Sequence, residues 1–164
     1  MKLCSACLLG LECRYDGKSN LEKAPEELLQ EYKNGNLIPV CPEQLGGLST
    51  PRSGARILSG DGKDVLDKNS RVSTDNDHDV TEQYLKGAYE TLKIAQDLNI
   101  QEAILKQKSP SCGCGYIQGG LEQRALVKGD GVTAALLKRN GITVKTEKDF
   151  SWSLSLNETN NLFF

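Results

Sequence analysis

Three cysteines that each come after a short apolar segment constrain this chain more than any other feature of its sequence. Cys7, Cys41 and Cys112 come after segments 2–6, 36–40 and 101–105, respectively. Short apolar runs bounded by turn residues indicate β-strands. Because ligands of parallel sheets bind beyond the carboxyl ends of the strands, we expect the three thiols to meet at one edge of a sheet.

Helical patterns separate the expected strands. Segment 25–34 begins with proline and two glutamates, segment 79–98 repeats apolar residues at helical spacing, and segment 132–139 ends at an Asn-Gly pair. A fourth strand is expected at 142–145. Strands therefore alternate with helices, which predicts an α/β fold. We expect a single compact domain with a mostly parallel, Rossmann-like sheet and helices on both faces.

Three further expectations concern the regions around these elements. Residues 55–66, around Gly60-Asp61-Gly62, have the pattern of a β-hairpin, and residues 67–79 are polar and indicate a long exposed loop. Tyr84 and Tyr89 are interpreted as packing residues of the long helix. His78 stands among aspartates and asparagine, which indicates a solvated loop residue.

Length and charge limit the classes of function. A chain of 164 residues suits one domain with a hydrophobic core. Its net charge of −2 and its 5% of aromatic residues disfavour a nucleic-acid partner, which usually requires a basic patch. No apolar run reaches the ~18 residues of a membrane span, and the N-terminal run is too short for a signal peptide. We therefore expect a cytoplasmic protein without a membrane partner, whereas its oligomeric state cannot be predicted.

The six cysteines indicate chemistry or metal binding. Disulfides are rare in the cytoplasm, where thiols more often bind metal or react. Because His78 is the single histidine, an all-sulfur site is favoured over a mixed one. Segment 109–115 contains only serine, proline, cysteine and glycine, and such a loop is suited to presenting side chains. The alternative is a surface turn with spare cysteines.

Three thiolates without histidine suit a soft metal or an iron–sulfur cluster. A 4Fe–4S cluster usually takes four cysteines, so three would leave one iron open for Lewis-acid chemistry on a substrate. The rival is a structural zinc site formed by Cys4, Cys7, Cys112 and Cys114. Its second pair is one residue short of zinc spacing, and a strand places Cys4 and Cys7 on opposite faces.

Four motifs spaced along the chain carry a resemblance. They are Ser5-Ala6-Cys7-Leu8-Leu9-Gly10 with Cys13-Arg14-Tyr15-Asp16-Gly17, Pro39-Val40-Cys41-Pro42-Glu43 with Gly46-Gly47-Leu48-Ser49-Thr50-Pro51-Arg52, Ser109-Pro110-Ser111-Cys112-Gly113, and Gly129-Asp130-Gly131-Val132-Thr133-Ala134-Ala135-Leu136-Leu137. Together they resemble a bacterial family, long described as a domain of unknown function, that includes the 2-thiouracil desulfidases.

The resemblance implies a compact α/β desulfidase-like domain over residues 1–148, followed by a C-terminal tail at 149–164. It also implies an oxygen-sensitive 4Fe–4S cluster that is held by Cys7, Cys41 and Cys112 and keeps one open iron. That iron would take the sulfur of a thiolated small molecule such as 2-thiouracil.

The same resemblance implies roles in non-redox hydrolysis of a C–S bond, which gives a carbonyl product and sulfide. Glu43 matches a carboxylate that activates water or shuttles protons. Ser109, or alternatively Ser111, matches a serine that supports the substrate or a proton transfer.

Some positions depart from the family pattern. Cys4 and Cys114 stand where the family has no cysteine, so Cys114 is an alternative ligand, and Cys13 is a further open candidate. An expected proline-rich segment is replaced at 53–56, and an expected Tyr-Asp-Gly is replaced at 118–120. Both changes lie near the expected pocket, so the substrate can differ from that of other members.

Two other functions remain open at this point. One is cluster-dependent sulfur transfer to tRNA or another acceptor, and the other is a non-catalytic zinc- or cluster-binding module. Transfer to tRNA would require a basic face, which the net charge of −2 does not indicate. A redox or iron-sensing module would show cluster chemistry but no turnover of a thiocarbonyl compound.

We expect protein purified without oxygen to be brown and to contain iron and sulfide in nearly equal amounts, because the thiols have few alternatives to a cluster. Elemental analysis and sulfide determination check this composition. Stoichiometric zinc without sulfide would contradict the prediction and favour a zinc-stabilised binding module.

Overall fold

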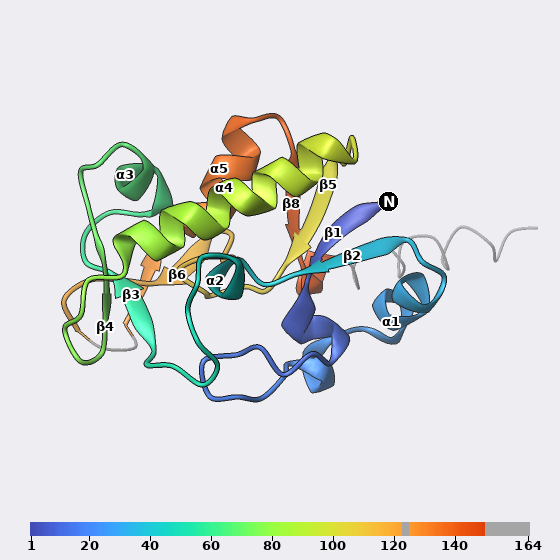
Figure 1. Cartoon of the computed structure of the whole chain (residues 1–164), viewed down its shortest axis with the longest axis horizontal. Coiled ribbons are helices and arrows are strands. Elements are labelled where there is room, and N and C mark those ends of the chain that lie inside the picture. The colour runs from blue at the N-terminus through green and yellow to red at the C-terminus, as the bar shows by residue number, and fades with distance from the viewer. Residues whose placement is uncertain (123–124, 150–164) are drawn as a thin grey trace, which may run out of the picture.

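A parallel four-stranded sheet forms the centre of the molecule. The computed structural model describes residues 1–122 and 125–149. Every neighbouring pair of strands is parallel, so all carboxyl ends lie at one edge. The predicted single α/β domain with a mostly parallel sheet is confirmed. The strand order is β2 (Leu37–Val40), β1 (Lys2–Ser5), β5 (Glu102–Leu105) and β8 (Thr143–Thr146), as Figure 1 shows.

Helices cover both faces of this sheet, as the sequence predicts. The two longest apolar helix faces, those of α4 and α5, pack on one side, and α1 packs on the other. The labelled helical elements of the described residues are the 3-10 turns η1 (Ala6–Leu9) and η2 (Leu21–Lys23), followed by α1 (Glu26–Lys33), α2 (Pro42–Leu45), α3 (Gly62–Leu66), α4 (Thr81–Asp97) and α5 (Val132–Arg139).

Strand alternation decides which side chains each helical layer receives. Leu3, Ala103 and Leu105 belong to the core under α4 and α5, whereas Cys4 and Ile104 belong to the smaller core under α1. Successive residues of a strand point to opposite faces, so neighbours such as Leu3 and Cys4 separate. The carboxyl edge between the two layers stays available for a site.

The β-hairpin predicted at 55–66 is wrong. β3 (Ala55–Ile57) pairs antiparallel with β4 (Val72–Thr74), and α3 lies between them, so the loop expected at 67–79 contains a strand. The Gly-Asp-Gly segment caps a helix: Asp61 Oδ1 accepts the Lys63 N–H at 2.9 Å, and Asp64 Oδ2 accepts the Asp61 N–H at 2.9 Å. Turns and helix caps use the same residue types, so the local pattern did not distinguish them.

A second short ribbon was not predicted. β6 (Tyr116–Gln118) pairs antiparallel with β7 (Leu126–Lys128), and it joins the first ribbon where Gly120 N–H donates to the Ile57 carbonyl at 2.8 Å. Each strand is too short for a clear alternation of apolar and polar residues. The two ribbons extend the molecule beside the central sheet (Figure 1).

The two tyrosines of α4 have different surroundings. Tyr84 is buried at 2% exposure and packs in the core as predicted, but Tyr89 is 56% exposed, so its assignment to packing is wrong. Tyr89 lies five positions after Tyr84, which turns its side chain away from the buried face of the helix. His78 is exposed, as its polar neighbours predict.

Two further expectations concern membrane-spanning helices and the C-terminal tail. Within residues 1–122 and 125–149, no helix combines the length and apolar character needed to cross a membrane. The tail expected at 149–164 lies outside the described residues from position 150 onward.

α2 and α4 touch through glycines. A Cβ at Gly87 would lie 1.8 Å from the Pro42 carbonyl oxygen, and a Cβ at Gly46 would lie 1.9 Å from the Gln83 carbonyl oxygen. Neither position tolerates a side chain without moving the backbone. This contact places α2 against the long helix and so fixes the position of Glu43, which lies in the first turn of α2.

We expect Gly87→Ala to destabilise the protein by about 1–3 kcal/mol, because the added methyl group pushes α2 away from α4. This net destabilisation remains after the ~1 kcal/mol that alanine gains over glycine in helix propensity. Urea unfolding measures the change. The matched control is Lys86→Ala on the exposed side of the same helix, which should stay within about 0.5 kcal/mol of the parent. Equal stability of the two variants would contradict a rigid contact.

Candidate functional site

A cavity of about 290 Å³ opens at the carboxyl edge of the central sheet. It lies where the strand order reverses, because the chain passes from β1 to β2 on one side and reaches β5 on the other. Such a reversal opens a crevice that commonly binds ligands. Ser5 at the end of β1 and Lys106 after β5 both line the cavity, and the Lys106 N–H donates to Ser5 Oγ at 2.9 Å.

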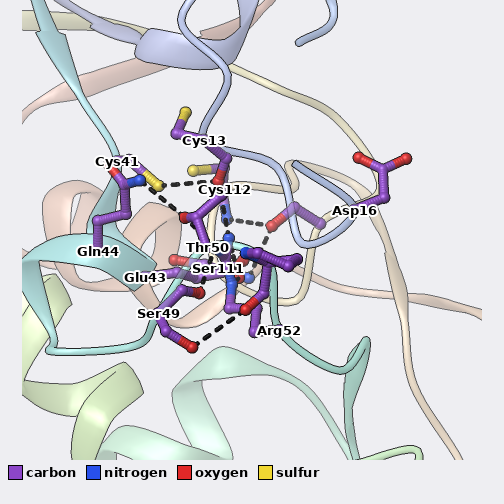
Figure 2. A network of polar contacts seen from close by, with 12 residues as sticks. Cys13, Asp16, Cys41, Glu43, Gln44, Ser49, Thr50, Arg52, Ser111 and Cys112 are labelled. Carbon is purple, nitrogen blue, oxygen red and sulfur yellow. Dashed lines mark hydrogen bonds and ion pairs between the residues drawn. The ribbon is translucent and has the colours of Figure 1, made fainter. Parts of the chain in front are cut away.

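Four cysteines line this cavity. Cys7 lies in η1 directly after β1, Cys41 is the N-cap of α2 directly after β2, and Cys112 lies in the loop after β5. The three therefore meet at one edge, as the strand pattern predicts. Cys13, in the loop after η1, is the fourth. Figure 2 shows the sulfur atoms of Cys13, Cys41 and Cys112 in the same part of the site.

Cys13 lies between two of the other thiols. It is 4% exposed, and its thiol forms hydrogen bonds with the thiols of Cys7 and Cys41. The bond from Cys13 lowers the pKa of Cys41 to about 7 and lowers the pKa of Cys7, whereas the pKa of Cys13 itself is raised. Burial raises the pKa of Cys112. Cys7 and Cys41 are thus the thiols that ionise most readily, which metal binding requires.

The loop that carries Cys112 rests on the N-terminus of α5. The first N–H groups of a helix have no partner within the helix. Here Val132 N–H donates to the Pro110 carbonyl and Thr133 N–H donates to the Ser111 carbonyl, both at 2.9 Å. A Cβ at Gly131 would lie 2.4 Å from the Ser111 carbonyl oxygen. Close contact between the third and fourth motifs therefore fixes the cysteine loop.

The two candidate serines have different positions. Ser109 lines the cavity, and its Oγ accepts the N–H groups of Ser111 and Cys112 at 3.1 Å each. The hydroxyl proton of Ser109 is not used in these bonds. Ser111 is 1% exposed, lies outside the cavity lining and has its Oγ 2.9 Å from Thr133 Oγ1. The structure brings Ser109 to the site and does not bring Ser111.

Glu43 lines the cavity and is held by two other side chains. Arg52 places Nε and Nη2 each 2.7 Å from Glu43 Oε2. The Tyr84 hydroxyl forms a hydrogen bond with the same carboxylate, and burial raises the pKa of Tyr84. The charge of Glu43 raises the pKa of Arg52 even though burial opposes the rise. The carboxylate therefore has a fixed position beside the thiols.

A buried ion pair brings a second cation to the cavity. Lys106 Nζ lies 2.8 Å from Glu147 Oε1, and the Gln107 N–H donates to Glu147 Oε2 at 3.1 Å. The positive charge of Lys106 adds to the lowering of the Cys7 pKa that the bond from Cys13 causes. The pair therefore links the ends of β5 and β8 to the electrostatics of the site.

Cys4 and Cys114 do not reach the cavity. Cys4 lies on the opposite face of the sheet, in the core under α1, where burial raises the pKa of its thiol. The Cys114 thiol forms hydrogen bonds with Asp130 and Lys138. The four thiols of the zinc alternative are therefore not brought together.

The donor set of the cavity consists of thiols, the ligands that iron–sulfur clusters use. Among the residues that the structure describes, no three His, Cys, Asp or Glu side chains are grouped closely enough to hold one metal ion. A polynuclear cluster spreads its thiolate ligands over several irons, so its ligands stand farther apart. Cys7, Cys13, Cys41 and Cys112 are the side chains here that can hold such a group.

Three site residues escaped sequence reasoning or remained open. Cys13 was an open candidate, Tyr84 was assigned to packing alone, and Arg52 was quoted only as part of a motif. Arg52 did carry a signal, because it is the first basic residue after Lys33 and shares that stretch with Glu43. Tyr84 carried none, since its apolar spacing is that of a core residue.

Comparison with known proteins agrees with the motif resemblance. Residues 3–149 match the family model described as 2-thiouracil desulfurase. The uncharacterized protein YbbK of Bacillus subtilis (strain 168) is 44% identical over 151 residues, which cover 92% of this chain and 98% of YbbK. The solved structure of the [4Fe-4S]-dependent thiouracil desulfidase TudS is 37% identical, with a TM-score of 0.81 over 94% of this chain and 97% of TudS. The chain belongs to the 2-thiouracil desulfurase family.

Proposed function

We propose that this protein is a 4Fe–4S-dependent desulfidase that removes sulfur from a thiolated small molecule such as 2-thiouracil. The observation that carries the proposal is one cavity lined by four thiols and a carboxylate held in place by arginine and tyrosine. Membership of the family and the likeness to TudS support it. A volume of about 290 Å³ suits a single small ring.

Cys7, Cys41 and Cys112 are the proposed ligands of the cluster. Cys7 and Cys41 come from the helical turns that follow β1 and β2, and Cys112 comes from a loop that the N-terminus of α5 holds, so rigid elements position all three. Cys13 is proposed to support Cys7 and Cys41 through its hydrogen bonds. Three ligands leave one iron open, and when bound the cluster supplies a Lewis acid that polarises a thiocarbonyl group.

The side chains of the site supply the proton transfers. Glu43 is proposed to take a proton from the water that attacks the thiocarbonyl carbon, because its carboxylate borders the same cavity as the thiols. The Ser109 hydroxyl, whose oxygen accepts two backbone N–H groups, is proposed to use its proton to bind the substrate or to pass on a proton. The C–S bond breaks and a C–O bond forms, so water and the thiocarbonyl give a carbonyl and sulfide without net oxidation. This chemistry fits the cytoplasm, where thiols stay reduced.

Replacing Cys7, Cys41 or Cys112 with serine should abolish retention of the cluster, because a hydroxyl is a poor substitute for a thiolate. The matched controls Cys4→Ser and Cys114→Ser should keep iron and sulfide, because neither side chain reaches the cavity. Iron and sulfide contents of anaerobically prepared variants measure this. If Cys13→Ser loses the cluster while one of the three proposed ligand variants keeps it, the ligand assignment is wrong.

Glu43→Gln should keep the cluster and lower turnover by roughly 10²- to 10⁴-fold, because the amide keeps the shape of glutamate but cannot act as a base. Glu90→Gln, on the exposed side of α4, is the control and should retain parental turnover. The assay is sulfide release from 2-thiouracil by cluster-loaded protein. Near-parental release by the fully loaded Glu43 variant would remove this residue from the mechanism.

The function itself is tested with the unaltered protein. Cluster-loaded protein should release sulfide from a thiolated pyrimidine and form the matching carbonyl compound, which chromatography identifies. Release from no thiolated pyrimidine would refute the proposed substrate class. Tight, salt-sensitive binding of tRNA would instead favour sulfur transfer to a nucleic acid.

A further inference from the structure

The guanidinium of Arg52 joins three segments of the chain at the cavity. Nη2 donates to the Cys13 carbonyl at 3.0 Å, and Nη1 donates to the Ser49 carbonyl at 3.2 Å and to Thr50 Oγ1 at 3.1 Å. Nε and Nη2 both reach Glu43 Oε2. Figure 2 shows Arg52 at the centre of this network. A guanidinium has five N–H groups, and these five contacts use all of them.

The environment of Arg52 requires this side chain and no other cation. The Arg52 side chain is 8% exposed, and a buried charge is costly unless every donor is paired. Lysine has three donors around one point and cannot reproduce a planar fork. A carbonyl from the Cys13 loop and a carboxylate from α2 are thus held by one rigid group.

Both contacts from Arg52 to Glu43 end on the same carboxylate oxygen. Oε2 receives Nε and Nη2 at 2.7 Å each, so Oε1 carries no bond from Arg52, and the Tyr84 hydroxyl also forms a hydrogen bond with this carboxylate. The surface pair of Arg139 and Asp67 differs, because Nη1 and Nη2 of Arg139 bind separate oxygens at 2.9 and 3.2 Å. The contact at Glu43 therefore distinguishes the two oxygens of the carboxylate.

We infer that Arg52 is the positioning residue of the reaction: it fixes Glu43 through Oε2 so that Oε1 is the oxygen that accepts the proton of the attacking water. The inference rests on the proposed function and assigns a separate role to each carboxylate oxygen of Glu43, the proposed base. In this role Arg52 acts through Glu43 and is not itself the base. Misplacing a catalytic group by about 1 Å can cost 10²-fold in rate, which sets the scale of its effect.

The experiment compares Arg52→Ala, Arg52→Lys, Glu43→Gln and the double variant Arg52→Ala/Glu43→Gln. Arg52→Ala should lower kcat for sulfide release by roughly 10- to 100-fold with little change in KM. Arg52→Lys should show a similar loss of kcat, because lysine cannot reproduce the planar fork of arginine. The double variant should be no slower than Glu43→Gln alone. Added guanidinium at millimolar concentration should restore part of the activity of Arg52→Ala, and sodium chloride at the same concentration should not.

The matched control is Arg139→Ala, which removes a paired arginine at the surface. It should keep parental kcat and should not respond to guanidinium. Iron and sulfide contents and the cluster absorbance of each variant show whether the cluster is retained. Three results would each overturn the inference. One is an unchanged kcat in Arg52→Ala, and another is a double variant whose loss of kcat is the product of the two single losses. The third is a fully cluster-loaded Arg52→Ala whose activity guanidinium does not restore.

A second measurement does not depend on turnover. A double-mutant cycle measures the coupling of Arg52 and Glu43. It compares the urea midpoints of the cluster-free parent, Arg52→Ala, Glu43→Gln and the double variant. Non-additive midpoints support the contact, and additive midpoints overturn it even if Arg52→Ala fails to bind the cluster. If the parent releases no sulfide while the midpoints are non-additive, the proposed function fails and the positioning contact stands.

Discussion

The reversal of strand order between β1 and β5 is the constraint on which the rest of the molecule depends. All four strands of the central sheet are parallel, so the chain leaves every strand at the same edge. Cys7 and Cys41 leave β1 and β2 directly, and Cys112 follows β5 after a short loop. The bond from Lys106 N–H to Ser5 Oγ holds the two central strand ends together at that edge. The parallel strand order therefore brings residues that are far apart in sequence to the lining of one cavity.

Close backbone contact then turns this edge into a fixed site. The small residues of the third and fourth motifs allow α5 to donate its first N–H groups to carbonyls of the Cys112 loop. Gly46 and Gly87 allow α2 to press on α4, which sets the position of Glu43. Glycine at these positions serves the packing of backbone on backbone, because any Cβ would overlap a carbonyl. The loop that presents Cys112 is thus also a packing element.

Periodicity predicted the central sheet and its main helices because these elements are decided by local burial. It failed at 55–66, where Asp61 caps α3, since helix caps and turns use the same residues. Strand ends predicted that Cys7, Cys41 and Cys112 would line one cavity. The placement of Cys13 and Arg52 depends on how the second motif folds over the first, which spacing does not encode. The sequence favoured Ser109 and kept Ser111 as the alternative; the structure separates them, because Ser109 lines the cavity whereas Ser111 is buried against Thr133.

Charge explains why thiols and cluster depend on each other in the proposed enzyme. Two partly buried cations of the cavity, Arg52 and Lys106, are paired with Glu43 and Glu147, and a third, Arg14, is paired with Asp16. Even so, Lys106 adds to the lowering of the Cys7 pKa, and Arg52 adds to the lowering of the Cys41 pKa. Cys112 differs, because burial raises the pKa of its thiol and the charges of Cys7 and Cys41 add to the rise, so this thiol holds its proton more strongly. A cationic iron–sulfur core would supply the missing charge, and its binding would be coupled to loss of that proton.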